Sequence, residues 1–357
     1  DLVFSGSGDF RFDGSVTTGR DLIGLASGPV AGNVVFGEGI IAGRNVSVVA
    51  PNGTIALLPG PTGRSLAGGS LAFTAREIGL SAVDVGGDLA LTAAAGSIDA
   101  TEVGSVGGAI ALVASDDVTF GALAAGGGSL VVDAGGTIAF VAAESSDTIT
   151  MAAAGALTGG NLTSPGTISL DAASIAIGDA VAGAFALASG SDILFDSLRS
   201  VGAISLAASN GLIGANTGAG DIESDGSVTL LARTIAVGDV TSGGSIGATA
   251  TAGDASFGAL DAVSAITIGA AGTASVASAG SGGNTSISGA SVSLASGSVG
   301  GDLRLNATGG NIAGTGAITV GGGIDLDASG DIGFGTLAAQ GGAFTADAGG
   351  GIAFDAA

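Results

Sequence analysis

The 357-residue sequence lacks the side chains on which most enzyme chemistry depends. It contains no histidine, cysteine, tryptophan or tyrosine, and its eight basic residues are all arginine. Histidine, cysteine, lysine and tyrosine supply most general bases, nucleophiles and transition-metal ligands. We therefore expect a chain that is not an enzyme and has no catalytic or cofactor-binding residues. The absence of cysteine excludes a disulfide scaffold but does not identify a compartment.

Positive charge is also scarce, with 8 basic against 31 acidic residues and a net charge of -23. Nucleic acids and anionic membrane surfaces attract clustered Lys and Arg, so this balance opposes both partners. Every apolar run is interrupted well before the roughly 18 residues that a membrane-spanning helix needs. We expect no nucleic-acid partner and no membrane insertion. The same charge keeps an apolar, repetitive chain soluble.

The chain is rich in glycine and in small apolar residues. Its 71 glycines could indicate disorder, but 46% of the residues are hydrophobic and the mean hydropathy is +0.66. Disordered segments have low hydrophobicity, so we expect an ordered chain. Apolar residues alternate with small or polar ones for four to five positions, and a Gly-rich turn follows, as in residues 108–123 and 323–337. This unit returns about every 20 residues over the chain.

The repeat predicts the fold. Alternation with a period of two indicates β-strands, and a unit this short cannot bury its own apolar face without stacking on its neighbours. We predict an all-β, right-handed parallel β-helix (β-solenoid) of about 18 coils of about 20 residues each, which would be about 85 Å long at the usual strand spacing. Residues 1–357 are expected to form a single continuous β-solenoid. Asp1-Leu2-Val3-Phe4 already has a strand pattern, so we expect a processed product or a segment of a longer protein.

The first apolar residue of each copy defines a common slot. Copies that start at Ile23, Val46 and Ile204 are longer than the rest, and an extra residue within a strand would turn its side chains to the other face. We therefore place the length changes in turns. The predicted slots are Leu2, Ile23, Val46, Leu71, Leu89, Ile110, Leu130, Ile149, Ile168, Phe185, Ile204, Val228, Ile246, Ile266, Thr285, Leu303, Ile324 and Phe344.

Aligning the copies assigns further residues to the inside or the outside of the coils. Arg304 and Asp325 fall in the same outward slot of successive coils, which predicts an exposed ion pair. Eight phenylalanines share one slot of the second strand, and we interpret them as an interior stack rather than a track for an aromatic ligand. They are Phe12, Phe36, Phe120, Phe140, Phe195, Phe257, Phe334 and Phe354.

One acidic segment resembles the start of a calcium-binding loop. Asp221, Glu223 and Asp225 lie in the long copy that begins at Ile204, followed by Gly226, but Ala232 stands where such a loop needs glutamate. If extended, the three carboxylates would share one face and could hold one Ca²⁺ weakly. The favoured interpretation is a solvated acidic bulge, so no cofactor is expected apart from this weak calcium candidate.

A polysaccharide-active β-helix protein is a further alternative, because glycosidic bonds are cleaved by paired carboxylates. The pair Asp116-Asp117 would point to opposite faces of a strand, and in the predicted turn it caps or solvates the chain. Sugar sites also favour aromatic platforms, and the exposed face offers none. These observations argue against cleavage.

The repeat itself resembles a known family. Blocks such as Gly87-Asp88-Leu89-Ala90-Leu91-Thr92-Ala93 and Gly202-Ala203-Ile204-Ser205-Leu206-Ala207-Ala208 are similar to the filamentous haemagglutinin-like exoproteins of two-partner secretion in Gram-negative bacteria. The resemblance implies export through an outer-membrane secretion partner and a secreted or cell-surface location. It also implies service as a long stalk in adhesion, aggregation or biofilm. The family has no catalytic residues to transfer.

Three hypotheses follow. The first is a structural, adhesive rod that contacts other copies of itself, or glycans and proteins of cell surfaces and extracellular matrix, through many weak contacts. The second is a filament-forming subunit that stacks head to tail through its end coils, because strand-like ends without polar caps would invite pairing. The third is the polysaccharide-active β-helix protein or an autotransporter passenger.

Overall fold

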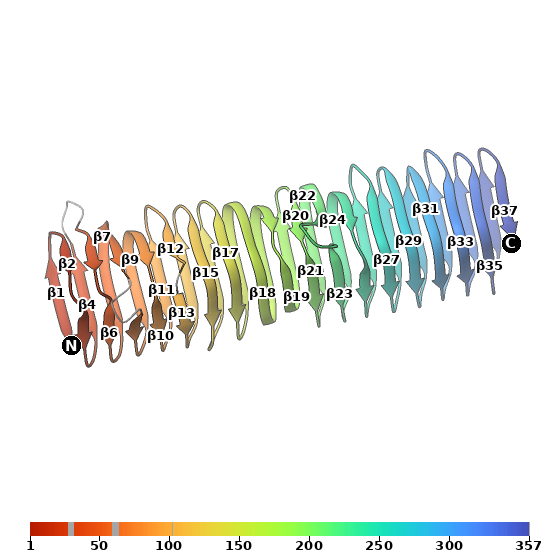
Figure 1. The fold of residues 1–357 in the computed structure, drawn as a ribbon. Helices are drawn as coiled ribbons and strands as arrows, with labels where there is room; N and C mark the ends of the chain where they lie inside the picture. Colours follow the sequence, from red (N-terminus) through yellow and green to blue (C-terminus); the bar gives the residue numbers. More distant parts are fainter. Residues whose placement is uncertain (28–31, 59–63, 102, 357) are drawn as a thin grey trace. The chain divides into compact units, whose positions relative to one another are not determined.

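The computed structural model describes residues 1–27, 32–58, 64–101 and 103–356, and this part of the chain contains β-strands and no helix. It therefore holds no helix that is long and apolar enough to cross a membrane. The chain divides into two compact units, Asp1–Ile177 and Gly178–Ala357, which are described separately. In each unit, parallel strands stack coil upon coil, as the predicted β-solenoid requires (Figure 1). The predicted all-β fold class is confirmed.

The strands of the first unit range from three residues to the 28 of β18, and their residues mostly alternate between buried and exposed. They are β1 (Leu2–Gly6), β2 (Phe10–Phe12), β3 (Val16–Thr18), β4 (Leu22–Ala26), β5 (Val34–Phe36), β6 (Ile40–Ala42), β7 (Val46–Leu57), β8 (Ser65–Ala67), β9 (Leu71–Leu80), β10 (Val83–Val85), β11 (Leu89–Ala93), β12 (Ile98–Ala100), β13 (Val103–Val106), β14 (Ile110–Ala114), β15 (Val118–Ala125), β16 (Leu130–Ala134), β17 (Ile138–Ser145) and β18 (Ile149–Ala176).

The second unit repeats the same pattern of strands. They are β19 (Asp179–Ser189), β20 (Ile193–Phe195), β21 (Ser197–Ser200), β22 (Ile204–Ala215), β23 (Asp221–Ser224), β24 (Val228–Val237), β25 (Val240–Ser242), β26 (Ile246–Ala250), β27 (Ala255–Ala262), β28 (Ile266–Ala270), β29 (Thr273–Ser281), β30 (Thr285–Gly289), β31 (Ser291–Val299), β32 (Leu303–Ala307), β33 (Ile312–Val320), β34 (Ile324–Ala328), β35 (Ile332–Ala339), β36 (Phe344–Ala348) and β37 (Ile352–Ala356).

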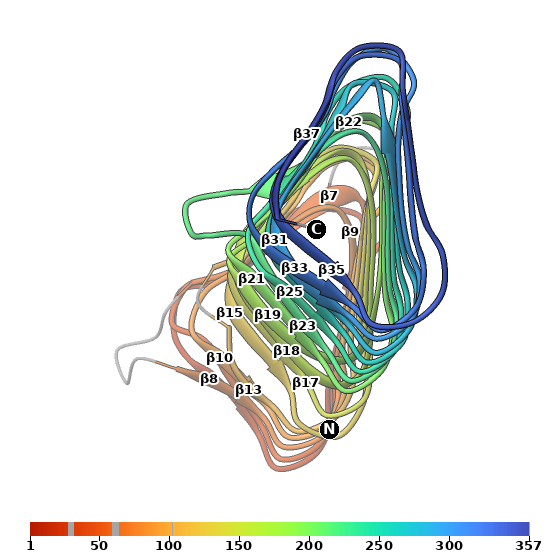
Figure 2. The same ribbon diagram turned by 90° about the vertical axis from the view of Figure 1, so that its right-hand side faces the viewer.

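Neighbouring coils pair in parallel and in register. In the first unit Val46 pairs with Leu71, Leu71 with Leu89, and Leu89 with Ile110, at the predicted slots. The predicted slots from Phe185 to Phe344 pair in the same way in the second unit. Each coil is three-sided when it is viewed along the stack (Figure 2). The repeat period of the sequence thus fixes which residues lie above one another.

One predicted slot is wrong by a single residue. Leu22, not Ile23, pairs with Leu2 and Val46, and Leu22 is fully buried whereas Ile23 is exposed. The inward set of this strand therefore includes Gly24, whose missing side chain leaves room for the ring of Phe4 in the neighbouring coil. The larger residues Ile23 and Leu25 consequently face solvent, which reverses what hydrophobicity alone suggests.

The phenylalanine stack is inside, as predicted, but it is interrupted. Phe36, Phe120, Phe140, Phe195, Phe257 and Phe334 are buried, and Phe12 and Phe354 at the outermost coils are half-buried. Rings stack where successive coils both carry phenylalanine, with centroids 5.1 Å apart for Phe12 and Phe36 and 5.2 Å for Phe120 and Phe140. Elsewhere Leu, Val, Ala or Gly follows the ring in the next coil. These stacks add to the coil register in segments.

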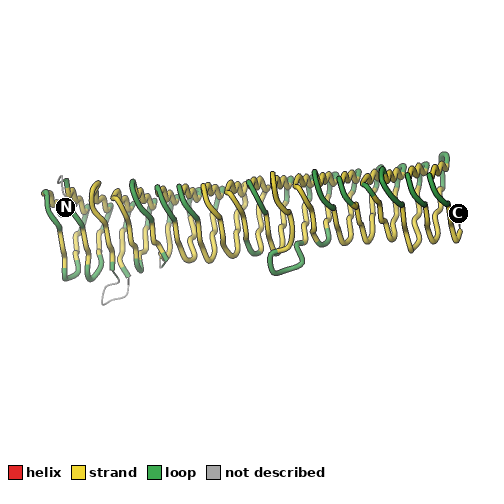
Figure 3. Tube along the Cα trace, turned by 90° about the horizontal axis from the view of Figure 1, so that it is seen from above, coloured by secondary structure: helices red, strands yellow, loops and turns green. Residues whose placement is uncertain are grey.

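The long copy that begins at Ile204 gains its extra length in a loop. Residues 216–220 leave the stack between β22 and β23, and the loop is visible as a green excursion in Figures 2 and 3. After the loop, β23 keeps one register with β21 and with β25. Before the loop, the pairing of β22 with β24 shifts register between Ala208 and Leu212. The predicted placement of this length change in a turn is confirmed. The predicted length changes of the other two long copies fall on segments that include residues 28–31 and 59–63, which lie outside the described residues.

Candidate functional site

The most extensive polar feature is a row of side chains at the coil corners, which we call the corner ladder. It consists of the polar residues that accept a backbone hydrogen bond from the next coil and that lie directly before a strand or, for Asp84 and Asp221, within one. Asp21 Oδ1 accepts from the Asn45 N–H (3.2 Å), Asn45 Oδ1 from the Ser70 N–H (3.0 Å), and Ser70 Oγ from the Asp88 N–H (3.1 Å). Asp88 Oδ1 then accepts from the Ala109 N–H at 2.9 Å. Each corner side chain therefore joins two coils.

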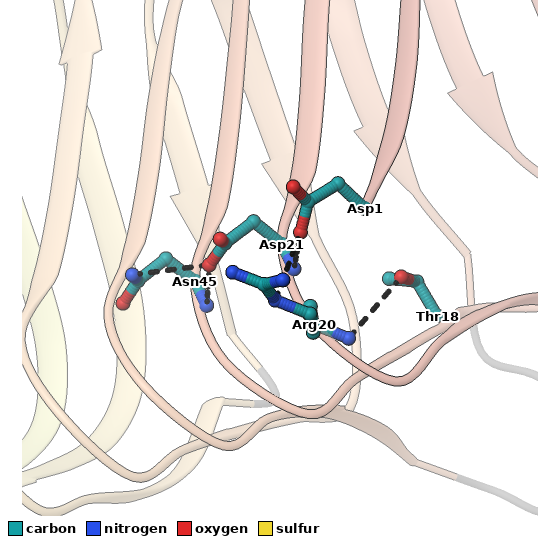
Figure 4. Close-up of polar contacts among 5 residues, drawn as sticks. All are labelled: Asp1, Thr18, Arg20, Asp21 and Asn45. Atoms are coloured by element: carbon teal, nitrogen blue, oxygen red, sulfur yellow. Dashed lines mark hydrogen bonds and ion pairs between the residues drawn. The ribbon is translucent and has the colours of Figure 1, made fainter.

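Figure 4 shows the first steps of this ladder. The Asp21 N–H donates to Asp1 Oδ1 at 3.3 Å, and the Arg20 guanidinium lies 3.4 Å from the same oxygen. Asn45 Nδ2 also donates to Asp21 Oδ1 at 3.3 Å. The Arg20 N–H is satisfied by Thr18 Oγ1 within the turn. The corner thus combines inter-coil hydrogen bonds with one exposed ion pair.

The ladder recurs at the other corners and in the second unit. Asp117 Oδ1 accepts from both the N–H and the O–H of Thr137, at 2.7 and 2.9 Å. In the second unit Asn284 accepts from the Asp302 N–H (2.9 Å), and Asp302 from the Gly323 N–H (2.8 Å). Carboxylate, amide and hydroxyl side chains are interchangeable here because only an acceptor oxygen is required.

Three ladder carboxyls have a lowered pKa. The hydrogen bonds from Thr137 lower the pKa of Asp117, with the backbone bond as the largest cause. The backbone N–H of Thr217 is the largest cause of the lowered pKa of Asp196, aided by Gly218. For Asp84 burial is the largest effect and raises the pKa, but hydrogen bonds from Ser105 and Arg64 together with the Arg64 charge outweigh it. Hydrogen bonds to the charged form favour that form.

A second row of polar side chains lies inside the corners. The hydroxyls of Ser164, Ser224 and Ser242 donate to carbonyl oxygens of the preceding coil at 2.6 to 2.7 Å, and each Oγ accepts from an N–H two residues later. Ser145 and Ser200 do the same. Within the described residues, every buried side-chain nitrogen or oxygen has a partner. The polar atoms inside the coils thus serve to join them.

One ladder residue, Asp196, holds the loop at 216–220, and a depression lies on the strands next to this loop. Asp196 accepts from the backbone N–H groups of Thr217 and Gly218 and from the Thr217 hydroxyl. The depression of about 250 Å³ lies beside it on β21, β23 and β25, where Arg199 and Glu223 form an ion pair at 2.6 Å. It is lined by Ser197, Leu198, Arg199, Asp221, Ile222, Glu223, Asp239 and Thr241.

The calcium candidate residues lie in this region but do not form a loop. Asp221–Ser224 is strand β23, with Ile222 and Ser224 buried, so the predicted bulge is wrong. The acidic side chains of Asp221 and Glu223 are exposed, as predicted. Asp221 accepts from the Asp239 N–H (2.8 Å), Glu223 pairs with Arg199, and Asp225 follows in the next corner. Within the described residues, no group of three acidic side chains is arranged to hold a metal ion. The alternation of Ile222 and Ser224 draws the segment into the stack.

Two further predicted pairs, Arg304–Asp325 and Asp116–Asp117, lie on an outward face and in a turn. Arg304 and Asp325 pair in register, with Nε and Oδ2 3.7 Å apart and both side chains exposed, so the predicted inter-coil ion pair is confirmed. Asp116 and Asp117 lie in a turn, where Asp117 caps the next coil. Sequence reasoning missed the corner ladder itself. Its signal is the polar residue directly before the first apolar slot, as in Asp88-Leu89 and Asp302-Leu303.

In comparisons with known proteins, no protein-family model, curated protein or solved structure matched this chain. Its function must therefore be argued from the geometry. That geometry joins coil to coil at every level: backbone pairing, apolar core, inner serines and corner ladder.

Removing the Asp196 carboxylate is expected to release the 216–220 loop. In Asp196→Ala the amides of Thr217 and Gly218 lose their acceptor, so their hydrogen exchange should accelerate about tenfold, as expected for loss of a charged hydrogen bond. Exchange measured by mass spectrometry on peptides covering this loop checks this. Asp196→Asn should retain most protection, and Asp261→Ala, which removes an exposed carboxylate of the same unit, should have no effect. Equal exchange in Asp196→Ala and the original chain would contradict this role.

Proposed function

We propose that this chain is a structural, adhesive segment of a secreted or cell-surface exoprotein, whose work is to hold a stiff array of coils and present their faces for contact. The observation that carries the proposal is the corner ladder. It spans successive coils in each unit, and its polar groups are used to hold backbone to backbone. A chain whose carboxylates form hydrogen bonds between successive coils is suited to bearing mechanical load.

The outward positions support contact over a wide surface. In β22, β24, β26 and β28 the first outward position is small and neutral, with Ser205, Thr229, Gly247 and Thr267. A flat face of this kind can contact a partner at many repeated positions, and weak contacts repeated along one chain add as avidity. The proposed partners are other copies of the chain, or glycans and proteins of cell surfaces and extracellular matrix.

The sequence resemblance suggests how the chain is exported. In the haemagglutinin-like exoproteins an outer-membrane partner exports the stalk, and we extend that route to this chain as part of the proposal. It places the chain at the surface of a Gram-negative bacterium, in adhesion, aggregation or biofilm.

Microspheres coated with the chain provide the test. Coated spheres should adhere to epithelial cells or to one another at least about tenfold more than albumin-coated spheres, because many weak contacts act together. Spheres coated with the acid-unfolded chain separate folded-state contacts from nonspecific ones. Adhesion no greater than that of the albumin spheres, both to cells and between spheres, would refute the proposal.

A further inference from the structure

A depression of the second unit lies where one row of the corner ladder stops. Asn284 and Asp302 continue the ladder, but the next two coils carry Gly323 and Ala343 in the same slot, so no polar side chain fills the corner. A depression of about 510 Å³ results, bordered by three successive outward positions, Arg304, Asp325 and Thr345. That volume lies within the range typical of small-molecule sites.

Arg304 gives this depression hydrogen-bond donors that its neighbours do not use. Its side chain is 61% exposed, its single ion pair to Asp325 is 3.7 Å long, and it makes no hydrogen bond within the described part of the chain. Arg199 differs, because it lies 2.6 Å from Glu223. The planar guanidinium offers several N–H groups in a fixed fork, which suits two adjacent acceptor atoms.

Acceptors surround these donors. Asp325 Oδ1 is held by the Thr345 hydroxyl at 2.9 Å, which fixes the carboxylate beside Arg304. Asp302 uses Oδ1 for the Gly323 N–H, and no described contact uses its Oδ2. The Ala343 methyl, the Thr345 methyl and the arginine stem supply an apolar wall. Adjacent donors and acceptors beside such a wall match the neighbouring hydroxyls and the C–H face of a sugar ring.

The charges of the second unit limit the class of ligand that this depression can bind. The second unit has three arginines against fifteen carboxylates, so it repels uronic and sialic acids. Arg304 lies next to Asp325, so a phosphate or sulfate would meet a carboxylate at the same point. We propose that this depression binds a neutral hexopyranose unit of a glycan, with Arg304 donating to adjacent hydroxyls and Asp302 and Asp325 accepting from them. The assignment rests on the proposed adhesive function and names its ligand class.

Saturation-transfer NMR with methyl glycosides tests the site. The probes are the methyl glycosides of mannose, glucose, galactose and N-acetylglucosamine, with methyl glucuronide as the acidic comparison. At least one neutral glycoside should receive saturation from the chain. Arg304→Met should weaken its binding about tenfold, the usual cost of losing hydrogen bonds to a charged donor.

A second variant fills the depression instead of removing a donor. Ala343→Asn restores a ladder side chain that Asn45 and Asn284 show to be compatible with this slot, and it should abolish the signal while thermal unfolding stays unchanged. Arg233→Met, an exposed arginine of the same unit outside the depression, should bind as the original chain does.

The outcomes separate the site from the proposed function. The sugar site would be overturned if no neutral glycoside received saturation, or if the chain preferred the glucuronide. It would also be overturned if Arg304→Met and Ala343→Asn bound the glycoside as well as the original chain does. If coated microspheres still adhere in that case, the adhesive function stands without this site. If coated spheres bind the glycoside but do not adhere, the sugar site is supported and the adhesive function is refuted.

Discussion

Replacing Gly159 with valine is expected to destabilise the first unit by about 3 kcal/mol, the upper end of the usual cost of overpacking a core. Gly159 pairs with Phe140 in the neighbouring coil, and the Phe140 ring occupies the space that a β-carbon on Gly159 would take. Phe140 is buried and stacks on Phe120 on its other side, so the ring has little room to move. The conflict must therefore be relieved by shifting the backbone of a paired strand.

A double-mutant cycle isolates this contact. Phe140→Ala alone should cost about 3 kcal/mol through the cavity it leaves. The double variant Gly159→Val/Phe140→Ala should lose less than the sum, because the valine fills space that the ring has left. Gly79→Val is the matched control, since a β-carbon there meets nothing within 4 Å. The midpoint of urea unfolding measures the stability of the original chain, the two single variants, the double variant and the control. If the stability losses of the two single variants simply add in the double variant, the predicted contact is contradicted.

The fold could be predicted largely because one pattern is repeated. Val46, Leu71 and Leu89 each begin a copy, and once they are aligned the parallel register follows, together with the outward pair Arg304–Asp325. The error at Ile23 has a specific cause. Hydrophobicity favours Ile23 and Leu25 as the inward set, but the Phe4 ring fills the space above Gly24, a contact between coils that no single copy reveals.

The corner ladder was harder to predict from the sequence, because its contacts also join different coils. A polar residue before many of the strands is visible in the sequence, but its partner is a backbone N–H about 20 residues away, as between Asp88 and Ala109. Only the stacked register shows that these groups meet. The acidic segment at 221–225 was predicted as a bulge because its carboxylates are spaced as in a calcium loop. The alternating burial of Ile222 and Ser224 instead makes it a strand.

Acid is expected to unfold the chain, with stability lost below about pH 4. Asp84, Asp117 and Asp196 have a lowered pKa in the folded chain, so the unfolded chain binds protons more readily. Their contribution is complete above the unfolded value of about 3.9 and is lost as the pH falls through the folded pKa. Thermal unfolding measured between pH 7 and pH 2 should show a midpoint that drops steeply below pH 4.

The triple variant Asp84→Asn/Asp117→Asn/Asp196→Asn tests whether the corner ladder causes this loss. An amide oxygen accepts the same backbone hydrogen bonds at every pH, as Asn45 and Asn284 already do, so the fall below pH 4 should be shallower than in the original chain. Removing three negative charges also weakens repulsion in a chain of net charge -23. The control Asp133→Asn/Asp171→Asn/Asp261→Asn makes the same charge change at exposed carboxylates outside the ladder. If both triple variants have the same pH dependence, charge repulsion and not the ladder governs acid unfolding. A shallower fall in the ladder variant alone assigns the loss to the corner hydrogen bonds.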